Sequence, residues 1–245
     1  MANPIIIDIS HHQADPIDWA KMKANGTIGV ILKATEGTSY TDPTYSSRKK
    51  AALAAGLKVS SYHFFKAGNP EKQMAYFLSV VLPVKGERVV IDHETDATLS
   101  DLKKAVQYLM DNAPDVEITI YSGHTIKDQL GSTKDDLLAA NTSLWIAQYT
   151  SAASPSWPKG TWPNWSLWQY TDKASVVGIN GPIDGNRFNG STDNAVKWMG
   201  PTAPDPAPAP KPEPTPEPET SPVIVSVQTP PGIPVQVVIN GRVYS

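Results

Sequence analysis

Short apolar runs alternate with amphipathic segments along the first 200 residues of the chain. Compact runs of aliphatic and β-branched residues, bounded by glycine or polar residues, predict buried strands. Eight segments have this pattern: PIIIDIS, TIGVILKATEG, KVSSYHFF, RVVID, VEITIYSG, SLWIAQY, WSLWQYT and GPIDGNRF. Apolar residues three or four apart predict helices between the early strands, whereas loops rich in proline, tryptophan and glycine join the later ones.

Capping and stop residues place the ends of the predicted helices. Gly56 is expected to end the second helix. Asn69 is expected to cap the third helix and Ser100 the fourth. The predicted helices cover residues 18–25, 44–55, 69–82, 99–113 and 134–140, and a last helix begins near residue 192. Strands and helices that alternate and then give way to strands alone predict an α/β fold, a barrel that becomes irregular towards its end.

The composition changes sharply after the last predicted helix. Residues 201–222 carry a proline at nearly every second position, which predicts a stiff polyproline II linker. The chain is therefore divided into a domain over residues 1–200, the linker, and a tail over residues 223–245. In the tail, Asn240-Gly241 between apolar residues predicts a β-hairpin. So short a tail cannot form a stable core alone, so we expect self-association, with ligand binding, docking on the barrel or fraying as alternatives.

Charge and composition exclude several classes of function. The net charge is −3, so no basic excess indicates a nucleic-acid partner. Cysteine is absent, which excludes disulfides and thiolate metal sites. No apolar run reaches the roughly 18 residues of a membrane-spanning helix. The N-terminal residues do not resemble a signal peptide, which predicts a cytosolic protein that needs a separate route for export.

Carboxylates and aromatic residues recur where the predicted strands end. Asp92 directly follows an apolar run, and in extended chain Glu94 would project to the same face. Two acidic residues with this spacing, considered by themselves, usually lie in a solvent-exposed loop. The ends of barrel strands, however, meet at one rim, where barrel enzymes hold their active sites. The residues at these ends are Asp8, Lys33, Glu36, Tyr62, His63, Asp92, Glu94, Tyr121, Trp145, Gln148, Tyr149, Trp168, Gln169, Asp184 and Asn186.

Acids surrounded by tryptophan and tyrosine suit glycoside hydrolysis. Aromatic faces stack on sugar rings, and paired carboxyl groups act as general acid and as nucleophile or stabiliser. Neighbouring anions help to raise the pKa of the acid. A metal site built from His63, His93 and the acids is the alternative. No dinucleotide-binding, P-loop or serine hydrolase motif is present.

Eight segments, in this order, closely resemble glycoside hydrolase family 25, the Chalaropsis-type muramidases found in many phage endolysins. They are IDISHHQ (7–13), IDW (17–19), KATEGTSYTDP (33–43), YHFF (62–65), IDHE (91–94), LWIAQY (144–149), LWQYT (167–171) and IDGNRF (183–188). The resemblance covers residues 3–199 and implies an irregular (β/α)5(β)3 TIM-like barrel. It also implies hydrolysis of the β-1,4 bond between N-acetylmuramic acid and N-acetylglucosamine in bacterial peptidoglycan.

The same resemblance implies roles for individual residues. Glu94 would be the general acid, with Asp8, Asp92 and Asp184 as further catalytic acids. Substrate contacts would come from Tyr62, Tyr121, Trp145, Gln169 and Lys33. The Asp92/Glu94 arrangement is similar to that of substrate-assisted glycosidases, so we favour Asp92 as the group that orients the substrate's N-acetyl group over direct attack or water activation. No metal or cofactor is expected.

Two other functional classes remain alternatives at this stage. One is a module that binds glycans in the cleft without cleaving them, although binding alone needs no buried acid. The other is a structural virion protein that carries the barrel as a passenger. For the enzyme, the resemblance and the predicted cytosolic location together indicate a phage endolysin that is held in the host cytoplasm until its release to the cell wall.

Overall fold

The computed structural model describes residues 6–201, 231–232, 237–239 and 242–244. The chain divides into two units, Met1–Pro206 and Ala207–Ser245, and each is treated by itself. The first unit holds nine strands within its described residues: β1 Ile6–Ile9, β2 Gly29–Glu36, β3 Tyr40–Thr41, β4 Lys58–Phe64, β5 Arg88–Asp92, β6 Glu117–Ser122, β7 Thr142–Ala147, β8 Leu167–Ala174 and β9 Ile183–Phe188.

Eight of the strands in residues 6–201 close into a barrel. The order is β1-β9-β8-β7-β6-β5-β4-β2, and β1 pairs with both β2 and β9. Neighbouring strands are parallel from β1 round to β8, but β9 runs antiparallel to β8 and β1. The predicted irregular barrel is therefore confirmed. The two-residue strand β3, which pairs with the end of β2, was not predicted.

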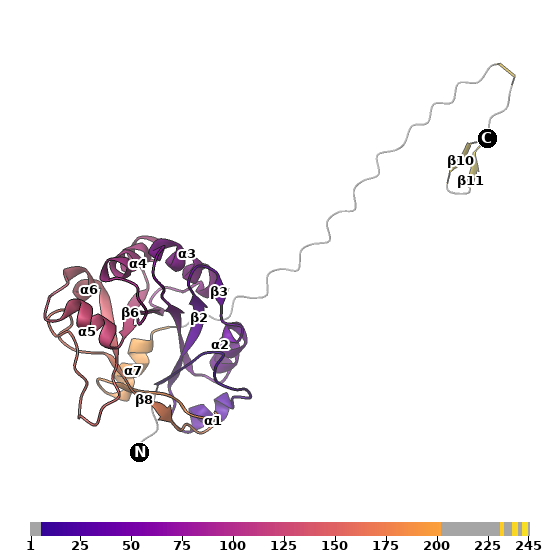
Figure 1. Ribbon diagram of the computed structural model, residues 1–245. Helices are drawn as coiled ribbons and strands as arrows, with labels where there is room; N and C mark the ends of the chain where they lie inside the picture. The colour runs from indigo at the N-terminus through magenta and orange to yellow at the C-terminus, as the bar shows by residue number, and fades with distance from the viewer. Residues whose placement is uncertain (1–5, 202–230, 233–236, 240–241, 245) are drawn as a thin grey trace. The chain divides into compact units, whose positions relative to one another are not determined.

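Helices surround the strands of the barrel (Figure 1). Those described are α1 Trp19–Ala24, α2 Tyr45–Ala54, α3 Pro70–Val81, α4 Leu99–Asn112, α5 His124–Leu130, α6 Asp136–Asn141 and α7 Thr192–Met199. The prediction missed α5, which is short and begins directly after a glycine. Asn69 holds the capping position of α3 but makes no side-chain cap hydrogen bond.

The predicted cap of α4 was wrong. Thr98, and not Ser100, accepts a hydrogen bond from the Asp101 backbone amide, and the Asp101 side chain accepts one in return from the Thr98 amide. This reciprocal capping box satisfies two backbone donors at once. The helix therefore begins at Leu99, so Ser100 lies inside its first turn.

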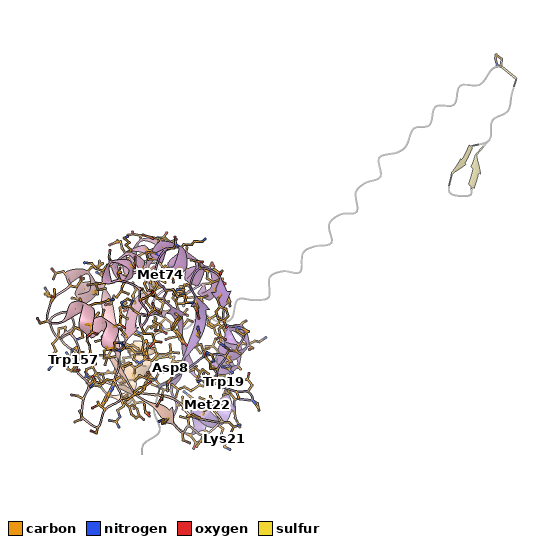
Figure 2. The ribbon with its side chains drawn as sticks, viewed as in Figure 1. Asp8, Trp19, Lys21, Met22, Met74 and Trp157 are labelled. Atoms are coloured by element: carbon orange, nitrogen blue, oxygen red, sulfur yellow. The ribbon has the colours of Figure 1, made fainter. Side chains whose placement is uncertain are left out.

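Two apolar layers hold the barrel together. The outer layer lies between strands and helices and includes Met22 from α1 and Met74 from α3, both fully buried (Figure 2). The inner layer includes Ile6, Ile31 and Met199. Met199 contacts the β2 and β4 residues Gly29 and Ser60, so α7 closes the end of the barrel at which the parallel strands begin. The opposite end, where those strands finish, is free to carry a site.

The described residues of the second unit form a small hairpin. Strands β10 Val237–Ile239 and β11 Arg242–Tyr244 pair antiparallel. Asn240-Gly241, the predicted turn, and the predicted linker over residues 202–222 lie outside the described residues. The domain boundaries of the tail stay a prediction. None of the helices in the described parts of the chain has the length and apolar character needed to cross a membrane.

Candidate active site

Asp92 and Glu94 lie at the end of β5 and are aimed at one cavity by the packing of the residue between them. Asp92 is buried as the last residue of the strand. The fully buried His93 points the other way, where its Nε2 is 2.8 Å from Gln129 Oε1. Its backbone amide donates to the Tyr121 carbonyl on β6, so the extended geometry persists past the strand end. Glu94 consequently returns to the side of Asp92, as alternation predicts, and is exposed at the cavity mouth.

Asp8 and Asp184 form a second carboxyl pair on neighbouring strands. They are directly opposite each other in the antiparallel ladder of β1 and β9, so their side chains share a face. Asp184 lies near the beginning of β9, not at its end as predicted. The reversed direction of β9 brings its first residues to the rim at which the parallel strands finish. The pair is linked by a hydrogen bond.

Two side-chain amides hold the buried Asp8. Asn186 Nδ2 donates to Asp8 Oδ2 at 2.6 Å, and Gln169 Nε2 donates to Asp8 Oδ1 at 3.1 Å. Each amide oxygen is fixed in turn by a donor: Asn186 accepts from the Trp145 indole at 2.8 Å, and Gln169 accepts from the hydroxyls of Tyr121 and Tyr149, both at 2.9 Å. Because an indole N–H can only donate, the orientation of the Asn186 amide follows from its partners.

One cavity gathers nearly all of the residues predicted for the site. It has a volume of about 80 Å³ and is lined by Asp8, Tyr62, Asp92, Glu94, Tyr121, Trp145, Gln169 and Asp184. Trp145 is only 2% exposed and contacts Tyr121 edge to face, with ring centroids 4.6 Å apart. These two rings therefore form the floor of the cavity and have little free face for stacking. The aromatic ring exposed at the rim is Tyr149, at 55%.

The structure does not place Lys33 among the residues that line the cavity. Its ammonium group is 2.7 Å from Glu36 Oε2 and lies over the Phe64 ring, 4.8 Å from the centroid. Glu36 also pairs with Lys66 at 2.6 Å. Lys33 acts on the site from a distance, since its charge opposes the rise in the pKa of both Asp92 and Glu94.

The pKa of each of the four carboxyl groups is raised, and burial is the largest cause for every one of them. Burial raises the pKa of Asp92 well above its usual value, and the charges of Glu94 and Asp8 add to the effect. Burial and then Asp184 raise the pKa of Asp8, against the hydrogen bonds from its two amides. Burial and the charge of Asp184 raise the pKa of Glu94, while His124 lowers it. Close carboxyl groups disfavour one another's ionisation, which favours the protonated form that a general acid needs.

The histidines proposed for a metal site are engaged in other contacts. His63 Nδ1 is 2.7 Å from Thr35 Oγ1 and its Nε2 is 3.1 Å from Gln73 Oε1. Burial lowers the pKa of His63 to about 4, so the ring is neutral. His93 turns towards Gln129 as described above. Within the described residues, no three His, Asp or Glu side chains are arranged to hold a metal ion.

Several residues of the site were noted at strand ends but given no role. Asn186 is two positions after Asp184, so the alternation of β9 places both on one face. Tyr149 follows Gln148 just beyond β7 and is bonded to the same Gln169 as Tyr121. His124 and Lys127 come from α5, the helix that the sequence pattern did not reveal.

Comparisons with known proteins identify the family of the chain. The model of the family described as glycosyl hydrolases family 25 matches residues 7–179. The autolytic lysozyme of Clostridium acetobutylicum is 32% identical over 75% of this chain and 55% of its own length. Lysozyme M1 of Streptomyces globisporus is 30% identical over 76% of this chain and 67% of its own. This chain thus matches little more than half of the first relative and two thirds of the second.

A solved structure extends the comparison to the fold. The bacterial lysozyme from Streptomyces coelicolor superposes with a TM-score of 0.68 at 27% identity, covering 79% of this chain and 95% of that one. The family match spans the segments that supply Asp8, Asp92 and Glu94, and β9 follows directly after it. The chain belongs to glycosyl hydrolase family 25 and is a glycoside hydrolase.

Proposed function

We propose that the barrel is an N-acetylmuramidase that hydrolyses the β-1,4 bond between N-acetylmuramic acid and N-acetylglucosamine in bacterial peptidoglycan. The observation that carries the proposal is the cavity in which four carboxyl groups meet aromatic and amide side chains. Lysozymes among the relatives support the choice of substrate. A glycan-binding module without activity would have no use for buried acids whose pKa values are raised.

Glu94 is proposed as the general acid. It stands at the mouth of the cavity, where a glycosidic oxygen can reach it, and its raised pKa favours the protonated form. In the first step its proton passes to the leaving oxygen as the glycosidic C–O bond breaks. In the second step the Glu94 carboxylate takes a proton from the water that attacks the sugar, which restores the acid.

Asp92 is proposed to orient the substrate's acetamido group. Its Oδ1 is buried and has no hydrogen-bond partner among the described residues, although it lies in a wall of the cavity. An acetamido N–H would supply the missing donor. The acetamido oxygen can then bond to the anomeric carbon while the Asp92 carboxylate stabilises the positive charge of the resulting ring. Asp8 and Asp184 complete the negative wall that favours an oxocarbenium-like transition state.

Analysis of the digestion products tests the proposal. Purified peptidoglycan should yield muropeptides with N-acetylmuramic acid at the new reducing end, identified by mass spectrometry after reduction. Reducing N-acetylglucosamine would show a glucosaminidase instead. Walls that bind the protein and release no fragments would support the non-catalytic module.

Three further parts of the proposal concern the whole chain. Residues 1–200 would be the catalytic domain, joined by the proline-rich linker to a tail that self-associates or binds the wall. Self-association is favoured because β10 and β11 form a sheet of two short strands within the described residues, and the edges of so short a sheet need partners. A role in phage-driven lysis, with the enzyme held in the cytoplasm until release, rests on the resemblance to endolysins alone.

A further inference from the structure

A second groove adjoins the acid cavity on the side of α5. The groove has a volume of about 350 Å³ and shares Glu94 and Tyr121 with the cavity. This volume suits a small molecule or a short peptide segment. His124 and Lys127 line it from α5, and Tyr149 lines it from the chain beyond β7. His124 and Lys127 are three positions apart on the helix, so they share one face.

Lys127 is a partly buried cation, and the carboxylate that acts on its charge is that of its exposed neighbour Asp128. Its ammonium group donates to Gln148 Oε1 at 2.6 Å, and no ion pair of Lys127 occurs among the described residues. The Gln148 oxygen also accepts from the amide and hydroxyl of Ser156, both at 3.0 Å. The ammonium is thus held in place by a neutral group that is already well supplied with donors. By contrast, Lys33 at the same rim is neutralised by Glu36.

We propose that this groove binds the peptide that N-acetylmuramic acid carries, and that Lys127, with His124 beside it, pairs with a carboxylate of that peptide. The inference rests on the proposed muramidase function. The muramic ring bears its peptide through the lactyl ether, on the sugar next to the bond that is cut. A ring seated at Glu94 therefore has its peptide within reach of the shared wall, where Lys127 supplies positive charge to the groove.

The test compares three glycan substrates of equal length. One carries its peptides, one has had them removed, and one carries peptides with amidated carboxylates. Lys127→Met should raise KM about tenfold on the first substrate, as expected for the loss of a charge-assisted contact, and leave KM unchanged on the other two. Lys127→Arg should restore the wild-type preference. Lys104→Met, at an exposed position of α4, is the control and should change nothing.

Two other results for Lys127→Met would contradict the inference. Equal increases of KM on all three substrates would mean that Lys127 only positions Gln148. Unchanged KM on the peptide-bearing substrate would remove the groove from peptide recognition. Failure of the proposed function looks different, because the wild-type protein itself would then cleave none of the three, or would cut the other glycosidic bond.

Discussion

Asp92 and Glu94 are two residues apart, yet their environments differ. Asp92 is 6% exposed and enclosed by the strand ends around β5, whereas Glu94 is exposed at the mouth. Burial is nevertheless the largest cause of the raised pKa of both. The different environments support the two proposed roles, in which Glu94 would reach the leaving group from the rim and Asp92 would contact the substrate from within the cavity.

Glu94→Gln should lower kcat on the order of 10²–10⁴-fold because it removes the donated proton and keeps the shape of the side chain. Turbidity loss of purified walls measures the rate, and circular dichroism checks the fold. Glu71→Gln, at an exposed position of α3, is the matched control and should retain full activity. If Glu94→Gln kept more than about a tenth of the wild-type rate, another group would be the acid.

Asp92→Asn should stabilise the fold near neutral pH while it abolishes most of the activity. The folded-state pKa of Asp92 lies above the ordinary value of 3.8, so its protonated form favours folding and its contribution is lost as the pH rises from 3.8 through the raised value. The neutral amide should add on the order of 1 kcal/mol to the free energy of unfolding at pH 7.

Urea unfolding at several pH values measures this effect. The difference between Asp92→Asn and wild type should grow from acid to neutral pH. Asp96→Asn makes the same change at an exposed position of the same loop and should change the free energy of unfolding at pH 7 only slightly. A destabilised Asp92→Asn at pH 7 would show that the buried carboxylate makes compensating contacts.

At the level of single elements, α4 depends on its capping box. Thr98→Ala should reduce the free energy of unfolding by about 1 kcal/mol, because the Asp101 amide loses its acceptor. Ser100→Ala, in the first turn of the same helix, is the control and should have little effect. Chemical denaturation with both variants measures the difference. The opposite ranking would restore Ser100 as the cap that the sequence pattern indicated.

The wrong assignment of Ser100 as the cap of α4 shows that an apolar pattern identifies a helix better than it locates the helix end. The pattern identifies α4 because its buried face repeats regularly over several turns, with Leu102, Val106 and Leu109 fully buried. It places the end of the helix poorly, because both Thr98 and Ser100 are acceptable caps by residue type. Only the reciprocal bond with Asp101 decides between them. The short helix α5 gave no such repeat, so His124 and Lys127 were not associated with the site.

The sequence pattern also could not predict the direction in which each strand runs. The spacing of Asp92 and Glu94 predicted their common face, and the structure has that face. For Asp184, the pattern indicated a strand but not which way it runs, since strand periodicity is the same in both directions. The strand-end argument predicted that Asp184 and Asp8 share one rim, but it assumed that Asp184 ends its strand. Asp184 instead lies near the beginning of β9, which reaches the same rim because it runs antiparallel to β1.

For the whole molecule, the first unit should fold without the linker and tail if the truncated chain retains all of α7. Met199 is fully buried, and Lys58 donates to the Gly200 carbonyl at 3.0 Å. A chain ending at Pro201 should therefore match the full chain in melting temperature and cleave soluble wall fragments equally well. In a chain ending at Trp198, which lacks Met199, the free energy of unfolding should fall by about 2–5 kcal/mol, as it does when a large buried side chain is removed.

Light scattering of the full chain and of the chain ending at Pro201 tests the role of the tail. Self-association predicts a larger mass for the full chain alone, together with faster lysis of intact cells, because linked barrels raise the local enzyme concentration on a surface. Equal monomer masses with faster lysis would favour wall binding. Equal masses with equal lysis would leave the tail without either role.

Pairing of β1 with β9 completes the acid cluster only late in the synthesis of the chain. The hydrogen bond from Asn186 to Asp8 joins residues 178 positions apart, and Asp184 enters the site on the strand that also closes the barrel. A growing chain on the ribosome therefore carries most of its acids long before it has either a closed wall or a complete acid cluster. Both are completed together when β9 pairs with β1 and β8, so we expect a chain that ends before β9 to lack activity.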